Sequence, residues 1–157
     1  YFEQYDGIWR HGDWIEITSG GSVIIFGRSD ATLNRDGIRI GTSEIYSAVE
    51  SIPEVADSII VCIEKEGGQY FMPLFVVMKE GNILSEEMKI KIKTRLKNLY
   101  SPRHVPDEIY AIAEVPYTIS GKKMEAPVKK ILMGTDPDKA ASRDTMRNPD
   151  SLNYFLP

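Results

Sequence analysis

The chain has 157 residues, of which 42% are hydrophobic and 27% charged, a composition typical of a folded globular protein rather than a disordered one. No apolar run is longer than five residues, whereas a membrane-spanning helix needs roughly 20, so the sequence argues against a membrane protein. Nineteen basic and 23 acidic residues give a net charge of −4, which argues against nucleic-acid binding.

The N-terminal part of the sequence predicts short strands joined by turns. Apolar segments at 15–17 and 23–26 flank a Gly-Gly pair, which is typical of a β-hairpin. Residues 34–37, Asn-Arg-Asp-Gly, predict a second turn before the segment 38–40. The chain begins at Tyr1, without a methionine or a secretory signal, and we interpret it as a section of a longer protein.

Hydrophobic periodicity predicts two helices. Ile45, Val49 and Ile52 recur at helical spacing after Gly41, and Pro53 predicts the end of this first helix. Ser85 is a favourable N-cap for the second helix. The apolar stripe expected on that helix consists of Met88, Ile92, Leu96 and Leu99.

The remaining segments predict a sheet. Residues 55–64 and 70–78 are rich in strand-forming residues and are joined by Lys-Glu-Gly-Gly, which predicts an antiparallel pair. Residues 109–113 predict a third strand and 128–132 a last short helix, and the chain is then polar and irregular as far as residue 152. This order predicts an α+β fold, a small mixed sheet of about three strands covered by helices and preceded by β-hairpins.

Cysteine and histidine are scarce. Cys62 is the single cysteine and lies in an apolar run, so we expect a buried thiol in a reducing, cytoplasmic compartment. His11 and His104 are the only histidines and lie far apart, which predicts no metal site in this chain. Generic phosphate-binding loops and nucleophile elbows are also absent from the sequence.

Three loops nevertheless carry residues suited to a nucleotide. Asp13 follows a glycine and can accept two hydrogen bonds from a ribose diol, although a Gly-Asp pair is more often a simple turn. Residues 27–41 hold three arginines and three glycines, which suit phosphate contact and a surface turn equally well. The loop 116–123 places a lysine after Ser-Gly, where it can deliver a mobile charge to a phosphate or simply be solvated.

Together these motifs resemble one family. Gly-Asp, then Gly-Arg-x-Asp at 27–30, Gly-x-Arg-x-Gly at 37–41 and Pro-x-Thr-x-Ser-Gly-Lys at 116–122 resemble the C-terminal portion of the adenylate-forming acyl-CoA synthetases, over residues 7–133. The segments Thr-Leu-Asn and Gly-Thr-Ser-Glu, and the tail 148–155, resemble the branch that acts on acetoacetate.

The sequence departs from the family pattern at two positions. His11 stands where threonine is usual before Gly-Asp, and Lys123 stands where an apolar residue is usual. The second departure raises the question whether Lys122 or Lys123 is the family's loop lysine. The position directly after Ser-Gly favours Lys122.

The resemblance implies a ligase that works in two steps. A carboxylic acid attacks the α-phosphate of ATP, with Mg²⁺, to give an acyl-adenylate and pyrophosphate, and the thiol of CoA then displaces AMP. By resemblance, Lys122 is the catalytic residue near the α-phosphate and the attacking carboxylate. Asp13 and Arg28 are implied to hold the ribose hydroxyls, and Arg39 to contact the nucleotide.

The resemblance also implies a domain that swings between the two steps. Asp30 matches the hinge position, Gly37 is expected to face the pantetheine channel, and Lys97 is expected to meet phosphates of CoA. The implied division is an end piece of a large N-terminal domain at 1–29, the mobile domain at 30–135 and a tail at 136–157.

This division predicts that the chain works only with its own N-terminal domain. That domain is expected to hold the ATP phosphate loop, the acid pocket and most of the Mg²⁺ site, so we expect the chain alone to be inactive. The alternatives are another short-chain acyl-CoA synthetase, an adenylation module that loads a carrier protein, and a non-catalytic interaction domain.

Overall fold

The fold is described from a computed structural model, which places residues 6–8, 11–28, 32–35, 37–65 and 67–156. Side chains are described for these residues except 26–28. Within this part of the chain, no helix combines the length and apolarity that crossing a bilayer requires.

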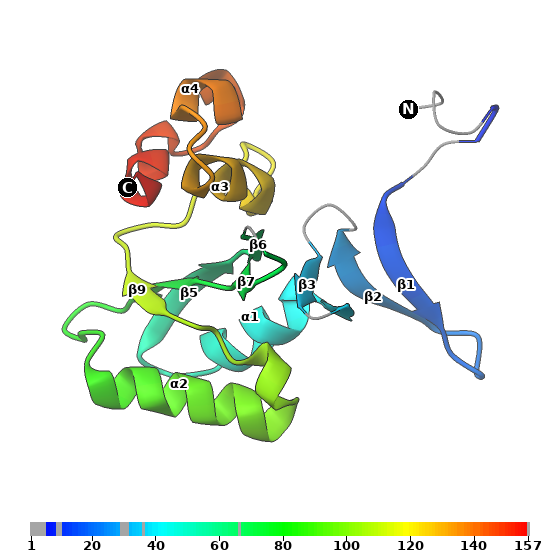
Figure 1. Cartoon of the computed structure of the whole chain (residues 1–157), viewed down its shortest axis with the longest axis horizontal. Helices are drawn as coiled ribbons and strands as arrows, with labels where there is room; N and C mark the ends of the chain where they lie inside the picture. Colours follow the sequence, from blue (N-terminus) through cyan, green and yellow to red (C-terminus); the bar gives the residue numbers. More distant parts are fainter. Residues whose placement is uncertain (1–5, 9–10, 29–31, 36, 66, 157) are drawn as a thin grey trace.

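A three-stranded mixed sheet forms the centre of the fold (Figure 1). Strand β5 (Val55–Ile60) pairs antiparallel with β8 (Leu74–Met78), and β8 pairs in parallel with β9 (Ile109–Ala111). Successive side chains of a strand point to opposite faces, and here both faces are apolar. The sheet is therefore covered on both sides, and the predicted α+β fold with a small mixed sheet is confirmed.

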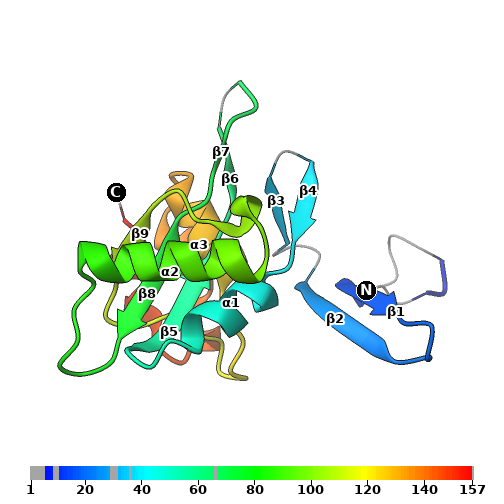
Figure 2. The same cartoon turned by 90° about the horizontal axis from the view of Figure 1, so that it is seen from below.

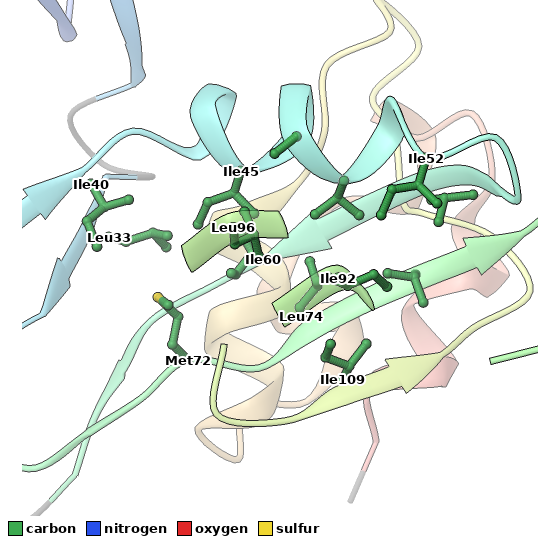
Figure 3. Close-up of a cluster of buried hydrophobic side chains, with 14 of the residues drawn as sticks. Leu33, Ile40, Ile45, Ile52, Ile60, Met72, Leu74, Ile92, Leu96 and Ile109 are labelled. Atoms are coloured by element: carbon green, nitrogen blue, oxygen red, sulfur yellow. The ribbon is translucent and has the colours of Figure 1, made fainter. Parts of the chain in front are cut away.

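Helices α1 (Thr42–Glu50) and α2 (Glu86–Leu99) cover the first face of the sheet (Figure 2). Figure 3 shows the side chains that meet there, from both helices, the three strands and the β3–β4 hairpin. Helix α2 begins as predicted, because the Ser85 hydroxyl accepts a hydrogen bond of 3.2 Å from the Met88 amide. Ile92 and Leu96 are fully buried, whereas Leu99, in the last helical turn, is 55% exposed, so the expected stripe is one residue too long.

The first helix is also close to its prediction. Ile45 and Val49 are buried on its inner face, and Ser51 caps the helix two residues before Pro53. Ile52 lies beyond the helix end but is still 2% exposed, since the turn that follows α1 folds back onto the sheet.

The second face of the sheet is covered by the C-terminal part of the chain (Figure 1). Helix α3 (Glu125–Leu132) is followed by α4 (Pro137–Ala140) and by the 3-10 helices η2 (Arg143–Thr145) and η3 (Pro149–Phe155). The prediction that 128–132 is the last helix and that an irregular segment follows is wrong. Short helices form there because Leu152 and Phe155, with the sheet residues Ile59 and Phe75, belong to one buried cluster.

Three hairpins complete the described part of the fold. β1 (Asp13–Ile17) pairs with β2 (Val23–Arg28), and β3 (Leu33–Arg35) pairs with β4 (Ile38–Ile40), as the two turn motifs predict. Strands β6 (Ile63–Glu64) and β7 (Tyr70–Phe71) extend the β5–β8 pair beyond a short break in each predicted strand. Between β5 and β6 lies Cys62, which is buried as expected. A 3-10 turn, η1 (Pro102–His104), leads from α2 towards β9.

Candidate active-site loop and nucleotide-facing hairpin

The loop at residues 116–123 is a closed turn with a defined backbone. The Thr118 amide donates to the Lys122 carbonyl at 2.9 Å, and the Lys122 amide donates to the Thr118 hydroxyl at 3.0 Å. Gly121 occupies the left-handed region at φ +81°, which a side chain would strain. An isolated antiparallel bridge between Tyr117 and Lys123 closes the base. The Ser-Gly-Lys motif therefore lies in a hydrogen-bonded turn, and this turn fixes the backbone of Lys122 in one conformation.

The two lysines at the end of this loop lie in different environments. Lys122 is exposed to solvent. The Lys123 side chain is only 14% exposed, and its ammonium contacts Glu50 at 2.5 Å and Asp57 at 2.8 Å. It also donates to the carbonyl of Ser58 at 2.6 Å. Because these three acceptors match the three donors of an ammonium group, Lys123 is engaged within the domain and Lys122 is the lysine that can reach a ligand.

The C-terminal tail lies along the same loop. The Asn148 carboxamide oxygen accepts from the Tyr117 amide at 3.0 Å, and its nitrogen donates to the Val115 carbonyl and to Glu114, each at 2.8 Å. The Arg147 amide donates to the Tyr117 carbonyl at 2.9 Å. These contacts hold the loop from the side opposite to Lys123. The sequence analysis did not predict that Asn148 contacts the loop, because no motif links the tail to the loop.

The β1–β2 hairpin carries the residues expected at the ribose. Asp13 and Arg28 are directly opposite each other in the strand register, at the open end of the hairpin. The Asp13 side chain is 19% exposed, and its carboxylate lies 2.5 Å from Nδ1 of His11. The unusual residue before Gly-Asp therefore contacts the acid that the resemblance places at the ribose.

A shallow pocket of about 200 Å³ lies between this hairpin and the start of α1. Its lining includes Trp14, Arg39 and Glu44, and the Arg39 guanidinium lies 4.1 Å from the centre of the Trp14 ring. A guanidinium held against an aromatic face keeps its edge donors for an anionic or polar ligand. Arg39 is thus brought next to the hairpin that carries Asp13.

The remaining predicted site residues lie elsewhere. Gly37 is in the β3–β4 turn at φ +76°, and a Cβ atom there would meet no atom within 4 Å. Lys97 is exposed in the last turn of α2. Asp30, the expected hinge, lies outside the described residues. In Figure 2 the β3–β4 hairpin and the 116–123 loop project from opposite sides of the domain.

Across the described residues, no group of three or more histidine, cysteine, aspartate or glutamate side chains is arranged to hold a metal ion. Of the predicted site residues, Arg39 lies next to the β1–β2 hairpin, whereas Lys122 lies on a separate loop.

Comparison with known proteins gives one consistent set of relatives. No protein-family model matches the chain. Acetoacetyl-CoA synthetase of Caenorhabditis elegans is 48% identical over 99% of the chain, which spans 22% of that relative. Acetoacetyl-coenzyme A synthetase of Rhizobium meliloti (strain 1021) is 42% identical, again over 99% of the chain and 23% of the relative.

A solved structure agrees with these relatives. Acetoacetyl-CoA synthetase from Streptomyces lividans superimposes with a TM-score of 0.90 at 45% identity, over 99% of this chain and 23% of that one. The chain thus spans less than a quarter of the length of the relatives it matches. Over almost its whole length, the chain is therefore similar in sequence and in fold to one section of the acetoacetyl-CoA synthetases.

Proposed function

We propose that this chain is the C-terminal part of an ATP-dependent acetoacetate–CoA ligase and supplies the lysine of its adenylation step. The observation that carries the proposal is the division between the two loop lysines. Lys122 is exposed at the end of a hydrogen-bonded turn, whereas Lys123 is bound by acceptors of its own domain. The names of the relatives support the choice of acid.

In the proposed first half-reaction, a carboxylate oxygen of acetoacetate attacks the α-phosphorus of ATP. A new P–O bond forms as the bond to the departing pyrophosphate breaks. Negative charge from both reactants gathers at this point, and the ammonium of Lys122 would offset it. A lysine suits this role because its four-carbon stem lets a compact charge enter and leave the site.

In the proposed second half-reaction, the sulfur of CoA attacks the acyl carbonyl carbon and AMP leaves. Lys122 and Gly37 lie on segments that project from opposite sides of the domain. A rotation about Asp30 would therefore replace the loop of Lys122 by the turn of Gly37 at a single active site. In that second arrangement, Lys97 would meet phosphates of CoA.

Asp13, Arg28 and Arg39 are proposed to bind the nucleotide in both steps. Asp13 can accept two hydrogen bonds from the ribose hydroxyls, and Arg39 lines the pocket next to the same hairpin, against the ring of Trp14. We assign Mg²⁺, the ATP phosphates and the acid pocket mainly to the remainder of the parent protein. That remainder is the chain's proposed partner, in a cytoplasmic setting.

The test is acid-dependent exchange between ATP and pyrophosphate in the full-length parent protein. Acetate, propionate, acetoacetate and 3-hydroxybutyrate would be compared, with Lys122→Ala as the variant and Lys130→Ala, an exposed lysine of α3, as the matched control. We expect the fastest exchange with acetoacetate, a loss of roughly 100-fold or more in Lys122→Ala, and no change in the control.

Other outcomes separate the alternatives. Faster exchange with a different acid would indicate another short-chain acyl-CoA synthetase. Exchange together with transfer of the acyl group to a carrier protein would indicate an adenylation module. No exchange with any acid in a folded parent protein would contradict the ligase and favour an interaction domain.

A further inference from the structure

A cluster of polar side chains lies beneath the loop of Lys122. We call it the Lys123 cluster, and its members come from α1, β5 and the two stems of the loop: Tyr46, Glu50, Asp57, Ser58, Tyr117 and Lys123. None of these residues is assigned a role by the proposed chemistry.

The loop is attached to the sheet at both stems through one carboxylate. Oδ1 of Asp57 lies 2.8 Å from the ammonium of Lys123, and Oδ2 accepts the phenol hydrogen of Tyr117 at 2.9 Å. Tyr117 and Lys123 are themselves bridged across the base of the loop. Asp57 therefore holds the beginning and the end of the loop together, and Lys122 is the residue directly before one of these anchors.

The ammonium of Lys123 also ties the loop to α1. Glu50 lies 2.5 Å from it at the C-terminal end of the helix, and the ring of Tyr46 lies 4.0 Å away. The Glu50 carboxylate accepts a second hydrogen bond, of 2.8 Å, from the Ser58 hydroxyl. With two carboxylates and a carbonyl around it, this ammonium has no donor left for a ligand.

We propose that Lys123 is a positioning residue for the adenylation step, which acts by holding the stem of the loop so that Lys122 meets the reacting groups. The proposal rests on the proposed role of Lys122. A displacement of about 1 Å at a reacting group costs roughly 100-fold in rate. Loss of the anchor should therefore slow adenylation even when the domain stays folded.

The main comparison of the experiment is between two variants of the full-length parent protein. Lys123→Met removes the charge at similar length, but leaves Glu50 and Asp57 facing each other without a cation. The triple variant Lys123→Met/Glu50→Gln/Asp57→Asn removes that repulsion while keeping the acceptor oxygens for Ser58 and Tyr117. Pyrophosphate exchange reports the first half-reaction, conversion of supplied acetoacetyl-adenylate and CoA reports the second, and the melting temperature reports folding.

We expect kcat for exchange to fall roughly 10- to 100-fold in both variants, with the second half-reaction unchanged. The triple variant should regain melting temperature relative to Lys123→Met without regaining exchange, and Lys123→Arg should be partly active because it keeps the charge. If exchange returns together with the melting temperature in the triple variant, or if both half-reactions fall equally, the role is only structural and the proposal is overturned.

Lys122→Ala separates this proposal from the function on which it rests. Exchange lost in Lys122→Ala but intact in Lys123→Met overturns the positioning role alone. Exchange intact in Lys122→Ala overturns the assignment of Lys122, and the positioning role with it.

Discussion

Two phenols next to the candidate active-site loop, residues 116–123, donate their hydrogens to carboxylates. Tyr46 donates to Glu125 at 2.9 Å and Tyr117 donates to Asp57 at 2.9 Å. Burial raises the pKa of Tyr46 well above its ordinary value, and the charge of Glu125 raises it further. Burial also raises the pKa of Tyr117, with the hydrogen bond to Asp57 as the second cause. Both tyrosines are thus held in the neutral, donating form.

These raised pKa values predict that the domain loses stability in alkali. Below the ordinary tyrosine pKa of about 10, both phenols are protonated in the folded and unfolded chain, and their contribution is fully present. Above it the unfolded chain binds fewer protons than the folded one, so the free energy of unfolding falls as pH rises. We expect urea midpoints of the 157-residue chain to decrease from pH 9.5 to 11, with a shallower decrease in Tyr46→Phe/Tyr117→Phe. An equal slope in both proteins would contradict this account.

The two lysines of the loop show which single-residue roles could be predicted from the sequence and which could not. Lys122 could be chosen because it directly follows Ser-Gly, a local feature. The anchoring of Lys123 depends on Glu50, which is 73 residues away in the sequence. No local sequence pattern pairs two residues so far apart, so the Lys123 cluster could be recognised only in the folded chain.

Among the elements, those with a regular period were predictable. Helices α1 and α2 and the three sheet strands carry apolar residues at spacings of 3.6 and 2, and the hairpins carry glycine-containing turns. The C-terminal tail has no such period, because a 3-10 helix has three residues per turn and occurs in short pieces. Its polar residues suggested an irregular segment, although Leu152 and Phe155 are buried.

The 3-10 helix η3 is predicted to stabilise the domain through one aromatic side chain. Phe155 is 1% exposed, and its ring meets that of Phe75 edge-on with centroids 4.8 Å apart. We expect Phe155→Ala to lower the free energy of unfolding by about 3–5 kcal/mol, since it leaves a cavity against the sheet. The matched control is the neighbouring Tyr154→Ala, where the side chain is 45% exposed.

That control should change stability by less than about 1 kcal/mol. Urea unfolding followed by circular dichroism measures both variants. Equal effects of the two substitutions would mean that the tail does not pack on the sheet as described.

At the scale of the whole molecule, the N-terminal hairpin differs from the rest of the domain. Strands β1 and β2 extend away from the sheet (Figure 1), and the apolar side chains described between residues 14 and 25 are open to solvent. Ile17 is 69% exposed and Ile25 is 61% exposed. An apolar surface of this kind in a folded protein usually marks a contact with another protein surface. We propose that the remainder of the parent protein covers it, in line with the expectation that residues 1–29 belong to the larger domain.

The proposed division of the active site between this chain and the remainder of the parent protein predicts that the isolated chain is folded but inactive. Lys122 can offset charge only where ATP and an acid are held beside it, and the proposed phosphate loop and acid pocket lie in the remainder of the parent protein. The purified 157 residues should therefore show the circular dichroism of an α+β domain and no acetoacetate-dependent pyrophosphate exchange at any ATP concentration. The full-length parent serves as the positive control. Exchange by the isolated chain that disappears in its Lys122→Ala variant would contradict the division and place a complete active site within these residues.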